Sequence, residues 1–273
     1  MKFVNNFLRD WKNQSFFFLS FVLGIAGIFG SANAKDIVWQ DAQGGKETRF
    51  VHKNVSYYAF SPRQAKQIAL YWQDEAGKNY YSFRSVMKQA KKQGKNIVML
   101  TNGAIYDQEF RPAGLWIEQG KLLKKVNRNK AKGNFHIEPA AVFYILGNQA
   151  KLVSLDTWEK QNIQADYALQ AAPMLLIAGK INLRFRPKIY SPYSRNGLCT
   201  TRDNQVYFVI TDTDKTPQDD LPNFYDFAES LQKLGCHQAV YLDGSISHLW
   251  SKNYSSLFHL RSFAGIIAVF DAD

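Results

Sequence analysis

Two amphipathic segments are each followed at once by a short apolar run, and this pattern limits the folds open to the chain. The first segment runs from about Ser82 to Gln93 and the second from about Asn223 to Leu234, each with an apolar stripe at helical spacing and a glycine at its end. The apolar runs that follow, 97–100 and 239–242, are typical of strands buried on both faces, and a third such run covers 206–210. The sequence therefore predicts an α/β (α+β) protein with a mixed β-sheet core and a few helices.

The rest of the chain adds strands and turns. Strands are expected at 36–40, 55–60 and 67–72, with hairpin turns at Gly147-Asn148 and Gly179-Lys180. No internal repeat, low-complexity tract or Pro/Ser-rich linker interrupts residues 35–273, which predicts a single compact domain. The composition, 46% hydrophobic and 21% charged, excludes a disordered, coiled-coil or collagen-like chain.

Residues 1–34 have the pattern of a secretory signal peptide. Three basic residues precede an apolar run at 16–29, and Ser31-Ala32-Asn33-Ala34 supplies the small residues of an A-x-A cleavage site. The apolar run is shorter than the roughly 20 residues that a membrane-spanning helix needs. We expect a mature chain that begins at Lys35, is periplasmic or secreted, and has no stable membrane insertion after cleavage. An uncleaved anchor is the alternative.

Charge and cysteine content bear on the partners and the compartment. The formal charge of +11 falls to +9 in the expected mature chain, which favours anionic envelope polymers or phosphorylated substrates. A nucleic acid partner is not expected, because no basic-aromatic motif accompanies the charge. Cys199 and Cys236 can form a disulfide in an oxidising compartment, and two buried free thiols are the alternative. The oligomeric state is left open.

Small polar residues follow each of the three apolar strands. The clusters are Thr101-Asn102-Gly103, Thr211-Asp212-Thr213 and Asp243-Gly244-Ser245-Ile246-Ser247. In open α/β sheets the ligand crevice lies beyond the carboxyl ends of the strands, so these clusters would meet if the strands are neighbours. Each cluster alone is an ordinary turn, but the three together predict a ligand site.

Two further segments can close such a site. Residues 106–112 carry Tyr106, two carboxylates and Arg111, while residues 191–197 carry Arg195. Arginine suits bidentate binding of phosphate, and a solvated charge or a salt bridge is the alternative for each arginine. The chain lacks HExxH, GxGxxG, GxxxxGK[ST] and GxSxG, and its histidines show no recognised metal spacing. No cofactor is certain, and the acidic run from Asp212 to Asp220 leaves a divalent cation open.

Seven stretches share their order and spacing with one known family. They are TNGAIYD at 101–107, RPAGLWIEQGK at 111–121, GNFHIEPAAVFYI at 133–145, APMLLIAGK at 172–180, SRNG at 194–197, NFYDFAESLQKLGC at 223–236 and YLDGSISHLW at 241–250. The chain thereby resembles the phosphodiester glycosidase domain family, to which the uncovering enzyme belongs. Within this family it is most similar to the bacterial exported branch. It departs from the family where Pro139-Ala140-Ala141 replaces the common Pro-Asn-Gly, and where Ala171-Ala172-Pro173 replaces Ser-Gly-Pro.

The resemblance implies an exported hydrolase that cleaves a sugar 1-phosphodiester at the glycosidic bond, in an envelope glycan or glycoconjugate. The expected catalytic residues are Asp243 as the main carboxylate, Asp212 as the second carboxylate and Arg195 as the phosphate-holding group. The expected substrate-binding residues are Asn102, Gly103, Tyr106, Arg111, Gly244, Ser245 and Ser247. Two alternatives are a non-catalytic saccharide-binding module and a cation-dependent phosphodiesterase.

Overall fold

The computed structural model describes residues 37–103, 105–244, 246–256 and 262–272. The expected signal peptide and Ser245 lie outside these residues. Within the described part of the chain, no helix has both the length and the apolar character needed to cross a membrane.

The strands of the described chain form three sheets, and every strand pairing among these residues is antiparallel. The 8-stranded sheet has the order β1 (Gln40–Ala42), β2 (Gly45–His52), β3 (Val55–Pro62), β14 (Val206–Thr211), β13 (Asn196–Thr200), β15 (Gln238–Asp243), β11 (Met174–Ile177) and β12 (Lys180–Ile181). The 5-stranded sheet has the order β7 (Lys121–Lys124), β6 (Trp116–Glu118), β10 (Tyr167–Ala171), β8 (Ala141–Leu146) and β9 (Gln149–Ser154). The 4-stranded sheet has the order β16 (Leu249–Ser251), β5 (Ile97–Asn102), β17 (Ile266–Phe270) and β4 (Ile68–Tyr71).

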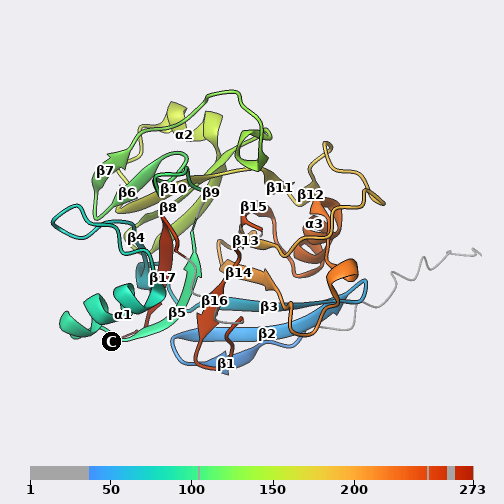
Figure 1. Cartoon of the computed structure of the whole chain (residues 1–273), viewed down its shortest axis with the longest axis horizontal. Coiled ribbons are helices and arrows are strands. Elements are labelled where there is room, and N and C mark those ends of the chain that lie inside the picture. The colour runs from blue at the N-terminus through green and yellow to red at the C-terminus, as the bar shows by residue number, and fades with distance from the viewer. Residues whose placement is uncertain (1–36, 104, 245, 257–261, 273) are drawn as a thin grey trace, which may run out of the picture. The chain divides into compact units, whose positions relative to one another are not determined.

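Each sheet is covered by one helix. Side chains of β14 alternate between the two faces of the 8-stranded sheet: Phe208 joins a core shared with both smaller sheets, whereas Val209 faces α3 (Phe224–Lys233). Helix α1 (Phe83–Lys92) packs on the 4-stranded sheet and α2 (Leu155–Gln161) on the 5-stranded sheet (Figure 1). Single-turn 3₁₀ helices lie at Ala65–Gln67, Asn134–His136 and Gln218–Asp220. The fold is therefore the expected mixture of a few helices with a β-sheet core.

Local sequence accounts for the two helices that were predicted. The side chains of Ser82 and Asn223 precede α1 and α3, and each accepts a hydrogen bond from the backbone N–H three residues further on. Gly94 and Gly235 follow the two helices with φ of +69° and +93°, a conformation that costs glycine little. Both helix predictions are confirmed, within a residue or two at their ends.

Two elements differ from the prediction. The expected strand at 36–40 is wrong, because β1 starts only at Gln40. The backbone oxygen of Val38 instead accepts a hydrogen bond from the hydroxyl of Thr48 at 2.7 Å. Helix α2 was not predicted, since its 7 residues are too few to show a repeating apolar stripe. Its one local signal is Ser154, whose hydroxyl caps the helix by accepting from the N–H of Thr157 at 3.2 Å.

A disulfide ties β13 to the chain that follows α3. Cys199 and Cys236 are bonded, with their Cα atoms 5.7 Å apart, and both side chains are buried between α3 and the large sheet. The alternative of two free thiols is thereby removed. The bond fastens α3 to the sheet that it covers.

Glu118 at the end of β6 carries a carboxylate that is mostly buried. Its Oε1 accepts hydrogen bonds from Trp116 Nε1 at 2.6 Å and from the backbone N–H of Trp72 at 2.7 Å. Burial outweighs these bonds and raises the pKa of Glu118 from 4.5 to about 7. Between pH 4.5 and 7 the folded chain therefore binds more protons here than the unfolded chain, and stability falls as the pH rises through that window.

We expect Glu118→Gln to remove this decline. The glutamine keeps an oxygen acceptor for both donors but does not titrate, so the free energy of unfolding between pH 5 and pH 8 should fall by about 2 kcal/mol less than in the parent chain. Urea unfolding at the two pH values measures the difference. Glu75→Gln, at an exposed glutamate, is the control and should behave like the parent. Identical pH slopes for Glu118→Gln and the parent would contradict the prediction.

Candidate active site

The ends of β5 and β15 meet, although the two strands belong to different sheets. Asn102 closes β5 and Asp243 closes β15, and Asn102 Nδ2 donates a hydrogen bond to Asp243 Oδ2 at 3.3 Å. Asn196, the first residue of β13, pairs with Asp243 in the ladder. Its Nδ2 donates to Asn102 Oδ1 at 2.9 Å. Two of the three predicted strand-end clusters are thus brought together, by packing between sheets rather than within one.

The amide of Asn102 is held in one orientation. Its Oδ1 accepts from the backbone N–H of His248 at 2.9 Å as well as from Asn196, so the oxygen side of the amide is fully used. Only the NH₂ side is left to face Asp243. Asn102 is therefore a positioning residue for the Asp243 carboxylate.

Both oxygens of the Asp243 carboxylate accept hydrogen bonds. Oδ1 accepts from the backbone N–H of Gly244 at 2.6 Å, and Oδ2 accepts from Asn102. The hydroxyl of Ser247 donates to the Asp243 carbonyl at 3.1 Å, which fixes the backbone of the turn. A side chain at Gly244 would place its Cβ 2.2 Å from the hydroxyl of Tyr241, so the close approach requires glycine. The carboxylate is half-buried and firmly oriented.

Arg195 is buried next to this site. Its Nε donates to the Pro222 carbonyl at 3.1 Å, its Nη2 donates to the Ser191 carbonyl at 3.1 Å, and its guanidinium lies 4.2 Å from the ring centroid of Phe224. Among the described residues no carboxylate lies within salt-bridge distance of it. Burial lowers the pKa of Arg195 from its ordinary value, although arginine stays charged. A buried cation of this kind favours an anionic ligand.

Tyr241 links the arginine to the Asp243 turn. Its ring centroid lies 5.7 Å from the Arg195 guanidinium, and its hydroxyl lies against Gly244. Burial raises the pKa of Tyr241 to about 12, so the phenol is protonated at neutral pH and can donate a hydrogen bond.

Gly103, from the first strand-end cluster, and Tyr106 and Arg111, from the 106–112 segment, are held by contacts within this loop or with neighbouring backbone. The Tyr106 hydroxyl donates to the Ser262 carbonyl at 2.9 Å, and the N–H of Gly103 donates to the Gly265 carbonyl at 2.8 Å. Arg111 forms ion pairs with Asp107 at 2.8 Å and with Glu109 at 2.6 Å. The hydrogen bond that Arg111 Nε donates to Asp107 Oδ2 raises the pKa of Arg111. Unlike Arg195, Arg111 is half-exposed and its charge is neutralised by carboxylates of its own loop.

Asp212 lies on the far side of β13 from Asp243. Strands β14 and β15 flank β13, which separates their backbones by about 10 Å. The N–H of Asp212 donates to the Ser56 carbonyl at 2.8 Å, and burial raises the pKa of its carboxyl. No group of three or more His, Cys, Asp or Glu side chains in the described residues is placed to hold a metal ion.

Asn102, Asn196, Asp243, Gly244 and His248 form a hydrogen-bonded group, which we call the Asp243 cluster. Two of these residues, Asn196 and His248, were missed by the sequence analysis. Asn196 is fully buried and also donates to Thr101 Oγ1 at 2.9 Å, while its own Oδ1 has no hydrogen-bond partner among the described residues. His248 accepts from the Thr101 hydroxyl with its carbonyl at 2.9 Å, and its Nδ1 lies 3.2 Å from Ser256 Oγ. Both residues fall inside family-like stretches, SRNG and YLDGSISHLW, which was the available signal.

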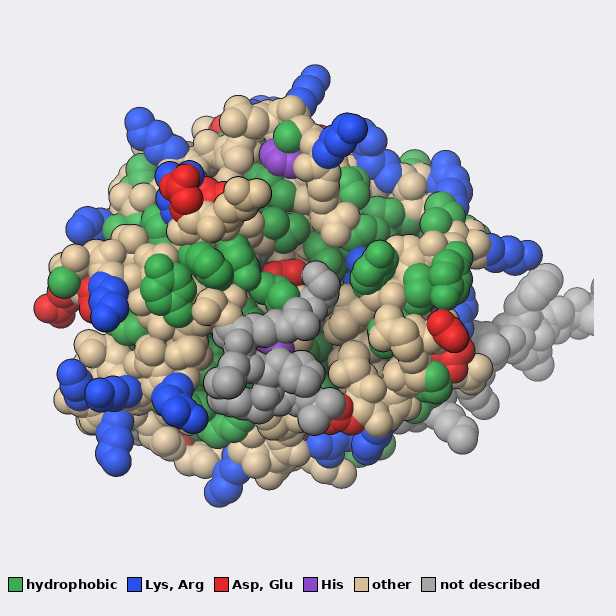
Figure 2. All heavy atoms as spheres, in the orientation of Figure 1, with side chains coloured by type: hydrophobic (Ala, Val, Ile, Leu, Met, Phe, Trp, Pro, Cys, Tyr) green, Lys and Arg blue, Asp and Glu red, His purple; other side chains and the backbone are tan. Residues whose placement is uncertain are grey.

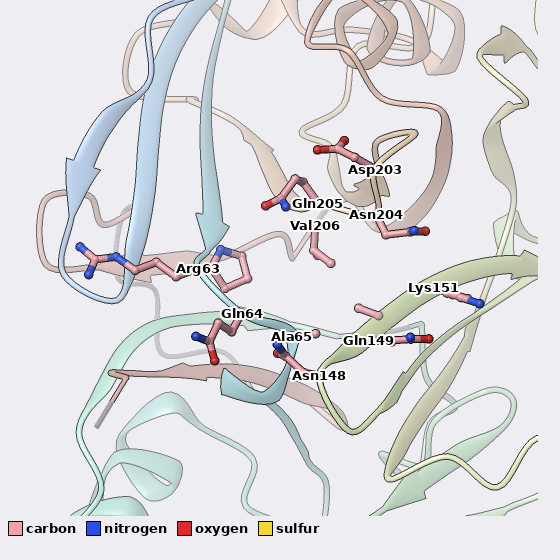
Figure 3. Close-up of a pocket in the computed structure, with 12 residues that line it drawn as sticks. Arg63, Gln64, Ala65, Asn148, Gln149, Lys151, Asp203, Asn204, Gln205 and Val206 are labelled. Carbon is pink, nitrogen blue, oxygen red and sulfur yellow. The ribbon is translucent and has the colours of Figure 1, made fainter.

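A separate polar pocket lies at the start of β14, the end of that strand opposite Asp212. It has a volume of about 360 Å³ and includes Gln149 of β9, Gln205 beside the start of β14, and Arg63 beyond the end of β3 (Figure 3). None of the predicted site residues lines it. The Asp243 cluster is therefore distinct from this pocket.

A comparison with known families decides the relationship. A sequence model of the phosphodiester glycosidase family matches residues 95–270. The chain belongs to this family. The matched range contains all of the Asp243 cluster and the Cys199–Cys236 disulfide.

One bacterial protein is similar to this chain in sequence, and two solved structures are similar to it in fold. The chain is 33% identical over 216 residues to the uncharacterized protein YigE of Escherichia coli (strain K12), covering 79% of this chain and 81% of that protein. Its fold is similar to the zebrafish N-acetylglucosamine-1-phosphodiester alpha-N-acetylglucosaminidase catalytic domain, auto-inhibited by its pro-peptide, with a TM-score of 0.59 and 14% identity over 87% of this chain and 83% of that one. It is also similar to a putative exported protein from Burkholderia pseudomallei K96243, with a TM-score of 0.51 and 9% identity over 79% and 74% of the two chains. The structural likenesses support the fold.

Proposed function

We propose that this chain is an exported hydrolase that cleaves a sugar 1-phosphodiester at its glycosidic bond. The observation that carries the proposal is a carboxylate, Asp243, oriented by Asn102 and Gly244 and next to the buried guanidinium of Arg195. No carboxylate of the described residues pairs with that guanidinium. The first group suits a developing positive charge at a sugar carbon, and the second suits a phosphate. Membership of the phosphodiester glycosidase family supports the same chemistry.

In the proposed reaction the bond between the anomeric carbon and the phosphate oxygen breaks. The phosphate monoester leaves with the bonding electrons, and because it is a good leaving group it needs little help from a general acid. Asp243 stabilises the oxocarbenium-like carbon or bonds to it, and water then supplies the new hydroxyl. Arg195, with the Tyr241 hydroxyl beside it, stabilises the charge on the departing phosphate. Asp212, which β13 separates from Asp243, is the candidate second carboxylate, and the reaction as written uses Asp243 alone.

The substrate class that we propose is an anionic envelope glycan or glycoconjugate. The chain is basic, at +11. Figure 2 shows Lys and Arg side chains mainly around the rim of the displayed face, with hydrophobic side chains nearer its middle. A positive rim raises the local concentration of an anionic substrate.

The test is sugar release from a panel of sugar 1-phosphodiesters in ¹⁸O-labelled water, with and without a chelator. Cleavage at the sugar carbon puts the label in the released sugar. Label in the phosphate, with loss of activity in chelator, would instead indicate the cation-dependent phosphodiesterase. Saturable binding without turnover by folded protein would indicate the saccharide-binding module.

We expect Arg195→Met to lower kcat/KM by about 10²- to 10³-fold, because it removes the cation that stabilises the leaving phosphate. The melting temperature should hold or rise, since the arginine is buried and no carboxylate among the described residues compensates its charge. Arg84→Met, at an exposed arginine of α1, is the control and should keep the parent rate. Arg111→Met compares the second predicted arginine, and a larger loss there than at position 195 would contradict the assignment.

Export is part of the proposal. The disulfide between Cys199 and Cys236 supports it, because such bonds persist in oxidising compartments. Intact-mass measurement of the chain recovered from the periplasm or medium tests it: cleavage after Ala34 is the expected result, and an intact N-terminus in the membrane fraction would indicate the uncleaved anchor.

A further inference from the structure

Four large apolar side chains are exposed in one loop between β12 and β13. They are Leu183, Ile189, Tyr190 and Tyr193, with exposed fractions of 84%, 55%, 76% and 53%. Figure 1 shows this loop, in yellow, projecting beyond the sheet next to α3. Single exposed apolar residues are normal, but a cluster on a projecting loop marks an interaction site.

Basic side chains alternate with these apolar ones. Arg184, Arg186 and Lys188 fall within residues 183–193, which contain no Asp or Glu. No carboxylate pairs with any of the three among the described residues. In the part of the chain that the structure describes, the acidic side chain that contacts the loop is Asp219, whose Oδ1 accepts from the Tyr190 hydroxyl at 3.3 Å. Positive charge therefore predominates at the loop.

The loop is held in place by contacts with α3 and its N-cap residue and by hydrogen bonds within the loop. Phe185 is buried and stacks on Phe224 of α3 with ring centroids 5.1 Å apart, and Asn223 Nδ2 donates to the Ile189 carbonyl at 2.9 Å. Arg186 Nη1 donates to the Leu183 and Phe185 carbonyls, which holds the turn together. The exposed apolar residues therefore lie on an internal loop that is fixed by these contacts.

We propose that this loop, residues 183–193, docks the protein reversibly on an anionic membrane surface. Leu, Ile and Tyr side chains partition into the headgroup region, and interspersed Arg and Lys bind anionic lipid headgroups. The alternation of the two kinds of residue favours a lipid surface over a purely apolar protein partner. Because the loop leads directly into Arg195, docking would place the candidate active site close to the lipid headgroups.

The test is vesicle binding by the chain without residues 1–34, whose apolar run would otherwise bind lipid itself. All described elements and core clusters lie after that segment, so the truncated chain keeps the whole described fold. Co-sedimentation with vesicles of 3:7 phosphatidylglycerol and phosphatidylcholine is compared with pure phosphatidylcholine. We expect at least about tenfold stronger binding to the anionic vesicles, weakened by added salt.

Two double variants separate the contributions. Leu183→Ser with Ile189→Ser removes apolar contact, and Arg184→Gln with Lys188→Gln removes charge; each should weaken binding at least about fivefold. Val51→Ser with Leu146→Ser is the matched control, since these side chains are exposed by 59% and 46% on other elements, and it should bind like the parent. Circular dichroism confirms folding of each variant.

Some outcomes would overturn the proposal. They are no binding of the parent chain to anionic vesicles, equal binding to anionic and neutral vesicles, or binding of the loop variants that equals that of the parent. The third outcome would indicate that the exposed loop binds a protein partner instead. The inference does not depend on catalysis, because Asp243→Asn should bind vesicles as the parent does.

Discussion

Replacing Asp243 by asparagine is expected to lower turnover of a sugar 1-phosphodiester by about 10³-fold or more. The variant loses the negative charge that stabilises the oxocarbenium-like transition state, which is the largest single contribution that we assign to a side chain. In the variant an NH₂ group or a neutral oxygen faces Asn102 Nδ2. In the parent chain that nitrogen donates to the charged Asp243 Oδ2 at 3.3 Å. Steady-state sugar release by the parent and variant chains measures the loss.

The matched control is Asp41→Asn, at an exposed aspartate of β1, which should keep the parent rate. Asp212→Asn is a further comparison: a loss of similar size would indicate a two-carboxylate mechanism, and a small loss would leave Asp243 as the one essential carboxylate. If Asp243→Asn kept a tenth or more of the parent rate while folding normally, the assignment of Asp243 would be wrong.

Removing the disulfide is expected to cost about 4 kcal/mol of stability. Cys199 and Cys236 are 37 residues apart, and closing a loop of that length restricts the unfolded chain by about this amount. For a domain of this size the melting temperature should fall by about 10 °C. Thermal unfolding of the Cys199→Ala/Cys236→Ala variant measures the change.

Reductant provides the control for this prediction. It should lower the melting temperature of the parent chain towards that of the double variant and leave the double variant unchanged. The contradicting result is a reduced parent chain, with both thiols titrated as free, whose melting temperature lies within about 2 °C of that of the oxidised chain. It would show that the bond contributes little to stability.

Local sequence was enough to predict helices α1 and α3 and the strands that follow them. The stripe of α3 and its Asn223 cap are both read within a dozen residues, and capping involves the backbone of the same segment. The β8–β9 turn at Gly147-Asn148 was readable for the same reason. Helix α2 was missed because it is short, and the strand at 36–40 failed because a hydrogen bond from Thr48, ten residues away, replaces ladder pairing at Val38.

The candidate site was predictable only in part. That Asn102 and Asp243 follow buried strands is visible in the sequence, and the family-like stretches contain both. That they touch depends on two sheets packing so that the ends of β5 and β15 meet. Asp212 has the same sequence signal, yet β13 lies between it and Asp243.

By itself the sequence determined the α+β class, the family and the polar residues at the strand ends, because each depends on neighbouring residues or on motif order. Only the tertiary structure decided that Arg195 is a buried cation with no paired carboxylate among the described residues, whereas Arg111 is neutralised, since the two arginines look alike in sequence. Ion pairing and burial depend on residues distant along the chain, such as Pro222 and Phe224 around Arg195. The direction in which the Asn102 amide faces was likewise decided by His248 and Asn196, which only the packing of the sheets brings to it.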